Sequence, residues 1–186
     1  NIRIGGWLRN VLECYSDGLL GHLEEIWPDV GPDNAWKGGN GDSWERGPYY
    51  ADGLVPMAFL LDSAALKEKA AVWIESALSS QRPDGDFGPA QNDDWWPRMV
   101  MLKAITQYAD GISDEAFYAR TEVFIDRYLE YFRKNIRQKP FSMWAYVRGG
   151  ELVSTILWMY DRKHDERYLD LARIVLDESM DWYSFF

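Results

Sequence analysis

The chain has 186 residues, 47% hydrophobic side chains and ten tryptophans, which excludes intrinsic disorder and allows one domain with a sizeable core. Its formal net charge of −10 argues against nucleic acid, because phosphates would be repelled, and favours a neutral, hydrogen-bonding ligand over a polyanion. No apolar run approaches the roughly 18 residues of a membrane-spanning helix. The single cysteine, Cys14, excludes an intrachain disulfide and a zinc site built from several thiolates.

Apolar residues recur at helical spacing along the whole chain, and strand signals are weak. An opening helix is predicted over 8–19, and three further helices with one apolar face over 66–78, 125–132 and 169–176. Three other segments, 54–61, 99–105 and 152–160, are apolar nearly all round, which predicts helices buried on several sides. The opening helix and the three one-sided helices have these apolar positions: Leu8, Val11, Leu12, Tyr15, Leu19; Leu66, Ala70, Trp73, Ile74, Ala77, Leu78; Ile125, Tyr128, Leu129, Phe132; and Leu169, Ala172, Val175, Leu176.

Proline residues indicate where the buried helices begin. Pro48 and Pro97 stand where the first turn of such a helix is expected, a position that tolerates the missing N–H group. Pro56 falls inside the first buried segment, so that helix is expected either to be kinked there or to start later.

A faint repeat of about 50 residues connects these segments. Each copy has tryptophan near its start, then Arg46, Arg98 or Arg148, and closes at Asp62, Asp110 or Asp161, for which capping or turn roles are expected. Repeats of this length are typical of stacked supersecondary units. Residues 1–186 are therefore predicted to form one all-α domain of stacked helical hairpins, with the apolar helices inside and the one-sided helices outside.

Long loops precede the buried helices, and we expect them to share one rim. The segments 31–47 and 82–94 combine Gly, Asn, Asp and aromatic residues, and long ordered loops often carry function. Aromatic faces cover the C–H faces of sugars, while carboxylates and guanidinium groups bind hydroxyls. The predicted sugar-binding residues are Trp44, Arg46, Tyr49, Tyr50, Trp95, Trp96, Arg98, Trp144 and Arg148, with Glu151 beside them.

Cleavage of a glycosidic bond needs a pair of carboxyl groups with different pKa values. The candidates for acid–base or hydroxyl-binding roles are Asp93, Asp94 and Glu45. His22 and His164 are isolated, so no metal site is predicted. The alternative is that the tryptophan and arginine residues are contacts of the repeat, with each arginine pairing with Glu45 or Asp94.

Several separated motifs resemble the N-terminal part of the β-L-arabinofuranosidase family of glycoside hydrolases. They are GWLR at 6–9, DGLLGHL at 17–23, SWERGPYYADGL at 43–54, QRPDGDFGP at 81–89 and DWWPR at 94–98. The resemblance implies six hairpins closed into an (α/α)6 toroid with a substrate funnel at the rim. It also implies a cysteine nucleophile and a zinc ion in the later half of the domain. No position here matches that centre, so no cofactor is expected in this segment.

Three functional hypotheses follow. At about 50 residues per hairpin, 186 residues supply three to four of six hairpins, so the first expectation is the N-terminal half of a glycoside hydrolase that contributes one wall of the funnel. The apolar end 181–186 is then expected to be covered by the remainder of the domain or by a second copy. The second hypothesis is a non-catalytic helical repeat module that binds a glycan or a peptide. The third, a terpenoid cyclase, is suggested by QRPDGDF at 81–87 but lacks an aspartate-rich acid motif.

Overall fold

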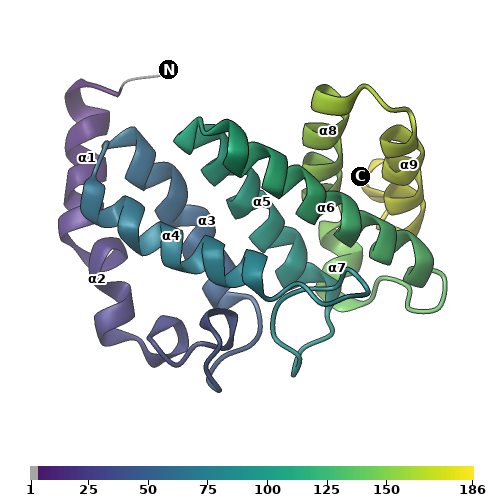
Figure 1. Cartoon of the computed structure of the whole chain (residues 1–186), viewed down its shortest axis with the longest axis horizontal. Helices are drawn as coiled ribbons and strands as arrows, with labels where there is room; N and C mark the ends of the chain where they lie inside the picture. The colour runs from purple at the N-terminus through teal and green to yellow at the C-terminus, as the bar shows by residue number, and fades with distance from the viewer. Residues whose placement is uncertain (1–3) are drawn as a thin grey trace.

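The computed structural model describes residues 4–186, which form α-helices and two short 3₁₀ turns and contain no strand (Figure 1). The predicted all-α class is therefore confirmed. The helices are α1 (Gly6–Asp17), α2 (Leu19–Ile26), α3 (Arg46–Leu60), α4 (Ala64–Ser79), α5 (Trp95–Ile112), α6 (Glu115–Asn135), α7 (Met143–Arg148), α8 (Gly150–Lys163), α9 (Arg167–Glu178) and α10 (Trp182–Phe185). The 3₁₀ turns are η1 (Pro28–Val30) and η2 (Ala35–Lys37).

Six of these helices form two layers. The inner layer is α3, α5 and α8, in which α5 lies between the other two. The outer layer is α4, α6 and α9, each of which packs against the inner helix that precedes it (Figure 1). This arrangement agrees with the predicted hairpins. Closure into a toroid, and the fraction of a toroid that the chain represents, stay predictions.

Burial follows the predicted difference between the layers in α3 and α5. The prediction was wrong for α8, in which only Leu152, Thr155, Ile156 and Met159 of 14 residues are buried and Leu157 is 42% exposed. In α5, 13 of 18 residues are buried, because the helix is covered by α3, α8 and α6. In α4 the buried residues are the six of the predicted stripe. In α9 the prediction was partly wrong: Tyr168 and Leu171 are buried with Ala172 and Val175, whereas Leu176 is exposed.

The first inner helix begins earlier than its apolar segment indicated. Helix α3 starts at Arg46, so Pro48 lies in its first turn, as Pro97 does in α5. Pro56 is inside α3 on a partly exposed side of the helix. Its missing N–H group leaves the Asp52 carbonyl without the usual partner in the helix.

The opening helix was predicted wrongly in two respects. Helix α1 ends at Asp17, so Leu19 belongs to α2, and α1 contains no buried residue. The two helices meet closely at Gly21, where an added Cβ would lie 1.7 Å from the Ser16 carbonyl oxygen. Only glycine allows this approach. Helix α1 therefore packs against α2 and is not part of the outer layer.

Apolar side chains are exposed at both ends of the array. Trp7 on α1 is 72% exposed at one end, and Phe186, beyond α10, is 97% exposed at the other. The C-terminal segment is held to α7, because the Met180 amide donates to the Tyr146 carbonyl at 2.9 Å. A covering partner for residues 181–186 stays a prediction.

Candidate functional site

Aromatic and charged side chains converge where α3, α5 and α8 begin and along the short helix α7. We call Trp44, Tyr49, Trp96, Trp144, Arg148 and Glu151 the Trp96 cluster. The Trp96 ring is its centre, with centroid distances of 5.5 Å to Trp44, 5.7 Å to Tyr49 and 5.7 Å to Trp144. The Arg148 guanidinium lies 5.7 Å from the same ring. The structure thus brings together five of the predicted sugar-binding residues.

The start of α5 holds the aromatic side of the cluster in place. Asp94 is the N-cap of α5, and its Oδ1 accepts from the Trp96 amide at 3.0 Å. Its Oδ2 accepts from Trp44 Nε1 at 2.9 Å, so one carboxylate binds both the Trp44 ring and the backbone of Trp96. Trp144 packs on Trp96 at an interplanar angle of 36° and is 46% exposed. Trp144 therefore presents an aromatic surface that a ligand can reach.

The polar side of the cluster is formed by Tyr49, Arg148 and Glu151. The Tyr49 hydroxyl donates to Glu151 Oε1 at 3.3 Å, and Arg148 Nη1 lies 3.6 Å from the same oxygen. Glu151 Oε2 is buried and has no hydrogen-bond partner among the described residues. Burial raises the pKa of Glu151, although Lys103, Arg148 and Tyr49 act in the opposite direction. Burial also raises the pKa of Tyr49, which keeps its hydroxyl protonated.

A second polar group adjoins the cluster on α3 and α5 and was missed by the sequence analysis. Asp52 accepts from Gln107 Nε2 at 2.7 Å and pairs with Lys103 Nζ at 2.8 Å. Helical spacing in the sequence would have identified Asp52 and Lys103. Asp52 lies three residues after Tyr49, and Lys103 lies seven after Trp96, so each shares a helix face with a cluster residue.

Four of the predicted sugar-binding residues make their contacts outside the cluster. Arg46 pairs with Asp42 at 2.8 Å and with Asp29 at 3.3 Å. Tyr50 packs on Trp73 and donates to the Leu20 carbonyl at 3.2 Å. Trp95 packs on Phe132 of α6 and donates to the Lys139 carbonyl at 2.9 Å. These contacts, and those of Arg98, connect loops and helices within the fold.

Arg98 anchors the loop 82–94 to α5. It is 2% exposed, and its Nε donates to Asp86 Oδ1 at 2.7 Å. Its Nη1 and Nη2 donate to the carbonyls of Asp94 and Asn92, each at 2.8 Å. Arg82 donates to Asp86 Oδ2 at 2.5 Å. Asp86 thus binds two guanidinium groups, and these contacts set the position from which Asp94 caps α5.

The three predicted catalytic carboxylates have different surroundings. Asp93 is 91% exposed and pairs with Lys139 at 2.8 Å, and hydrogen bonding to Lys139 lowers its pKa. Asp94 is occupied as the cap and as the acceptor for Trp44. Glu45 precedes α3 without a side-chain capping bond, and its Oε2 is buried without a partner. A lowered pKa does not suit a general acid, so Asp93 is the weakest of the three candidates for that role.

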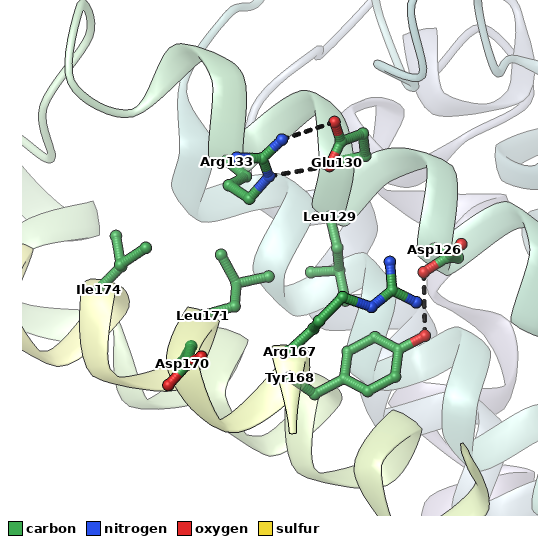
Figure 2. Close-up of a pocket in the computed structure, with 9 residues that line it drawn as sticks. All are labelled: Asp126, Leu129, Glu130, Arg133, Arg167, Tyr168, Asp170, Leu171 and Ile174. Carbon is green, nitrogen blue, oxygen red and sulfur yellow. Dashed lines mark hydrogen bonds and ion pairs between the residues drawn. The ribbon is translucent and has the colours of Figure 1, made fainter. Parts of the chain in front are cut away.

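Two open pockets lie elsewhere on the molecule. Figure 2 shows the first, between α6 and α9, with charged residues such as Asp126 and Arg167 around Leu129 and Leu171. In it Tyr168 donates to Asp126 at 2.9 Å, and Arg133 is bound to Glu130. The second lies between η2, the end of α4 and 88–91. Residues 4–186 contain no group of three or more His, Cys, Asp or Glu side chains suited to a metal ion.

Comparison with known proteins gives no match: neither family models, nor curated proteins, nor solved structures are similar to this chain at a significant level. The relationship to the β-L-arabinofuranosidase family is therefore a proposal carried by the motifs of the sequence. Within the described part of the chain, no helix has the length and apolar character that crossing a bilayer requires.

Proposed function

We propose that the chain binds carbohydrate at the Trp96 cluster, as part of a glycoside hydrolase of the β-L-arabinofuranosidase type. The observation that carries this proposal is the exposed face of Trp144 beside Arg148, Tyr49 and Glu151. An aromatic face next to hydrogen-bonding groups suits a ring that has C–H bonds on its faces and hydroxyls on its edges. The net charge of −10 fits a neutral sugar.

The contacts of Trp144 make it the residue of choice for a test. W144A removes the accessible platform, while the contacts of Trp96 with Trp44 and Tyr49 are left in place. We expect the variant to lose about 1.5 to 3 kcal/mol of binding free energy for an arabino-oligosaccharide, or roughly tenfold to more than a hundredfold in Kd. Isothermal titration calorimetry measures the loss. The free energy of unfolding should change by no more than about 1 kcal/mol, because the side chain is half exposed.

Trp7 supplies the matched control. It is 72% exposed on α1, so W7A removes the same side chain outside the cluster. We expect W7A to bind the oligosaccharide as the wild type does. Equal affinity of W144A and the wild type would remove the Trp96 cluster as the binding site. Equal losses in both variants would indicate a general effect of tryptophan removal.

A second candidate function, a binding module without catalysis, is favoured by one observation. Asp94 is occupied as a cap, and Asp93 is paired with Lys139 away from the cluster, so two of the three candidate carboxylates already have structural contacts. Assay of the protein on arabinofuranosyl substrates separates the candidates. Binding without turnover by the full-length protein would support the module, whereas turnover supports the hydrolase.

A further inference from the structure

The Glu151 carboxyl group is poorly stabilised as an anion. Its side chain is 17% exposed, and Oε2 is buried without a hydrogen-bond partner in the described residues. The contacts to Oε1 are long, at 3.3 Å from the Tyr49 hydroxyl and 3.6 Å from Arg148. A buried carboxylate oxygen without a partner costs more free energy than the same oxygen in a neutral acid. The local geometry therefore favours the protonated form.

Charged groups lie near Glu151 on three neighbouring helices. They are Asp52 on α3, Lys103 on α5 and Arg148 at the end of α7, with the Tyr49 hydroxyl between them. Lys103 is itself paired with Asp52 at 2.8 Å, and its charge acts on Glu151 in the direction opposite to burial. Arg148 remains 44% exposed and has Glu151 as its only ion-pair partner in the described residues, at a long distance. Of the two nearby carboxyl groups, Asp52 is therefore closely paired, whereas Glu151 has only long contacts.

We propose that Glu151, the Tyr49 hydroxyl and the Arg148 guanidinium form a subsite for sugar hydroxyl groups, in which Glu151 acts as a carboxylic acid rather than as a carboxylate. This inference rests on the proposed carbohydrate binding at the Trp96 cluster. Toward a ligand the neutral acid can donate through Oε1, since Oε2 is buried; the Tyr49 hydroxyl, which donates to Glu151, has acceptor capacity left; and the arginine donates only. The subsite is therefore matched to vicinal hydroxyls at the edge of a ring that lies on Trp144.

The subsite predicts a pH dependence with a defined direction. Burial raises the pKa of Glu151 from its usual 4.5, so the folded protein holds this proton more tightly than the unfolded chain. The stability that this proton provides is complete below pH 4.5 and is lost as the pH rises through the raised pKa. Sugar binding should weaken over the same interval, since ionisation removes the donor.

The variant E151Q separates this role from a structural one. Glutamine keeps a donor and an acceptor but carries no charge. We expect E151Q to bind the arabino-oligosaccharide at every pH between 4 and 8 with the affinity that the wild type has at pH 4. Its urea midpoint at pH 8 should lie above that of the wild type, because no buried charge forms. E151A should bind at least tenfold more weakly than the wild type at pH 4.

Glu166 provides the control, since it is an exposed glutamate whose Oε1 also accepts from a tyrosine hydroxyl, that of Tyr160 at 3.5 Å. E166Q should change neither affinity nor its pH profile. Loss of binding in E151Q, or wild-type affinity that rises with pH, would show that the carboxylate is the binding form and overturn this inference. So would a lower urea midpoint of E151Q at pH 8, or full binding by E151A. If the wild type binds no oligosaccharide, the proposed function itself fails; if W144A loses binding while E151A keeps it, only this inference fails.

Discussion

Replacing Arg98 by alanine is expected to destabilise the protein by about 3 to 5 kcal/mol, one of the two largest effects that we predict. Arg98 is almost completely buried, and four hydrogen bonds connect it to Asp86, Asn92 and Asp94. Its removal leaves Asp86 with Arg82 as its remaining cationic partner and removes the donors to two partly buried carbonyls. Urea denaturation measures the loss.

The ion pair between Arg98 and Asp86 also predicts how the stability of R98A depends on pH below 4. Burial alone would raise the pKa of Asp86, but the charge and hydrogen bonds of Arg98, followed by Arg82, hold it below its usual 3.8. The stability that results is present above pH 3.8 and is lost as the pH falls through the lowered pKa. The stability of R98A should therefore depend less on pH below 4 than that of the wild type. A loss below about 1 kcal/mol with an unchanged acid profile would contradict this account of the loop.

Replacing Trp73 by alanine is the second large change, with an expected loss of about 3 to 5 kcal/mol. Trp73 on α4 is fully buried, its Nε1 donates to Glu24 at 2.7 Å, and its ring packs on Tyr50 and under Lys37 at 4.4 Å. The side chain therefore joins the outer layer to α2, to η2 and to the start of α3. The loss should appear in thermal and urea unfolding.

The variant W73F separates packing from the hydrogen bond. Phenylalanine keeps much of the buried ring but removes the donor to Glu24, so W73F should be less destabilised than W73A. Gly47 lies against the same ring, since an added Cβ would stand 2.8 Å from Trp73 Cζ3. If W73A loses no more unfolding free energy than W7A, Trp73 of α4 does not stabilise the segment before α3 that carries Trp44.

The helices could be predicted from the sequence wherever one apolar stripe was unambiguous. The stripe of α4 was confirmed because its alanine, leucine and tryptophan residues fit a single helix face. In α9 two overlapping stripes exist, and Tyr168 is drawn inward because its hydroxyl can donate to Asp126 at 2.9 Å. That choice depends on a residue 42 positions away, which local periodicity cannot reveal. Helix α1 was misjudged because an amphipathic pattern shows an apolar face but not what covers it.

The candidate site was predicted as a region but not as a set of contacts. Grouping by loop put Trp95 and Trp96 together, although neighbouring helical residues point about 100° apart. Trp95 faces α6, whereas Trp96 faces α3 and α7. The sequence predicted Arg98 to bind sugar, because it cannot show that Arg98 pairs with Asp86 of the loop 82–94. Helical register, applied from Tyr49 and Trp96, would have indicated Asp52 and Lys103.

The most direct test of the Trp96 cluster as the carbohydrate site is the response of the tryptophan indole N–H signals to a sugar. The chain has ten tryptophans, and a ¹H–¹⁵N spectrum resolves each indole as a reporter at a known place in the fold. On titration with an arabino-oligosaccharide, we expect the signals of Trp144, Trp96 and Trp44 to shift, while those of Trp73 and Trp7 stay in place. Shifts confined to Trp7 or Trp182 at the ends of the array, or no shift at saturating sugar, would contradict the proposal.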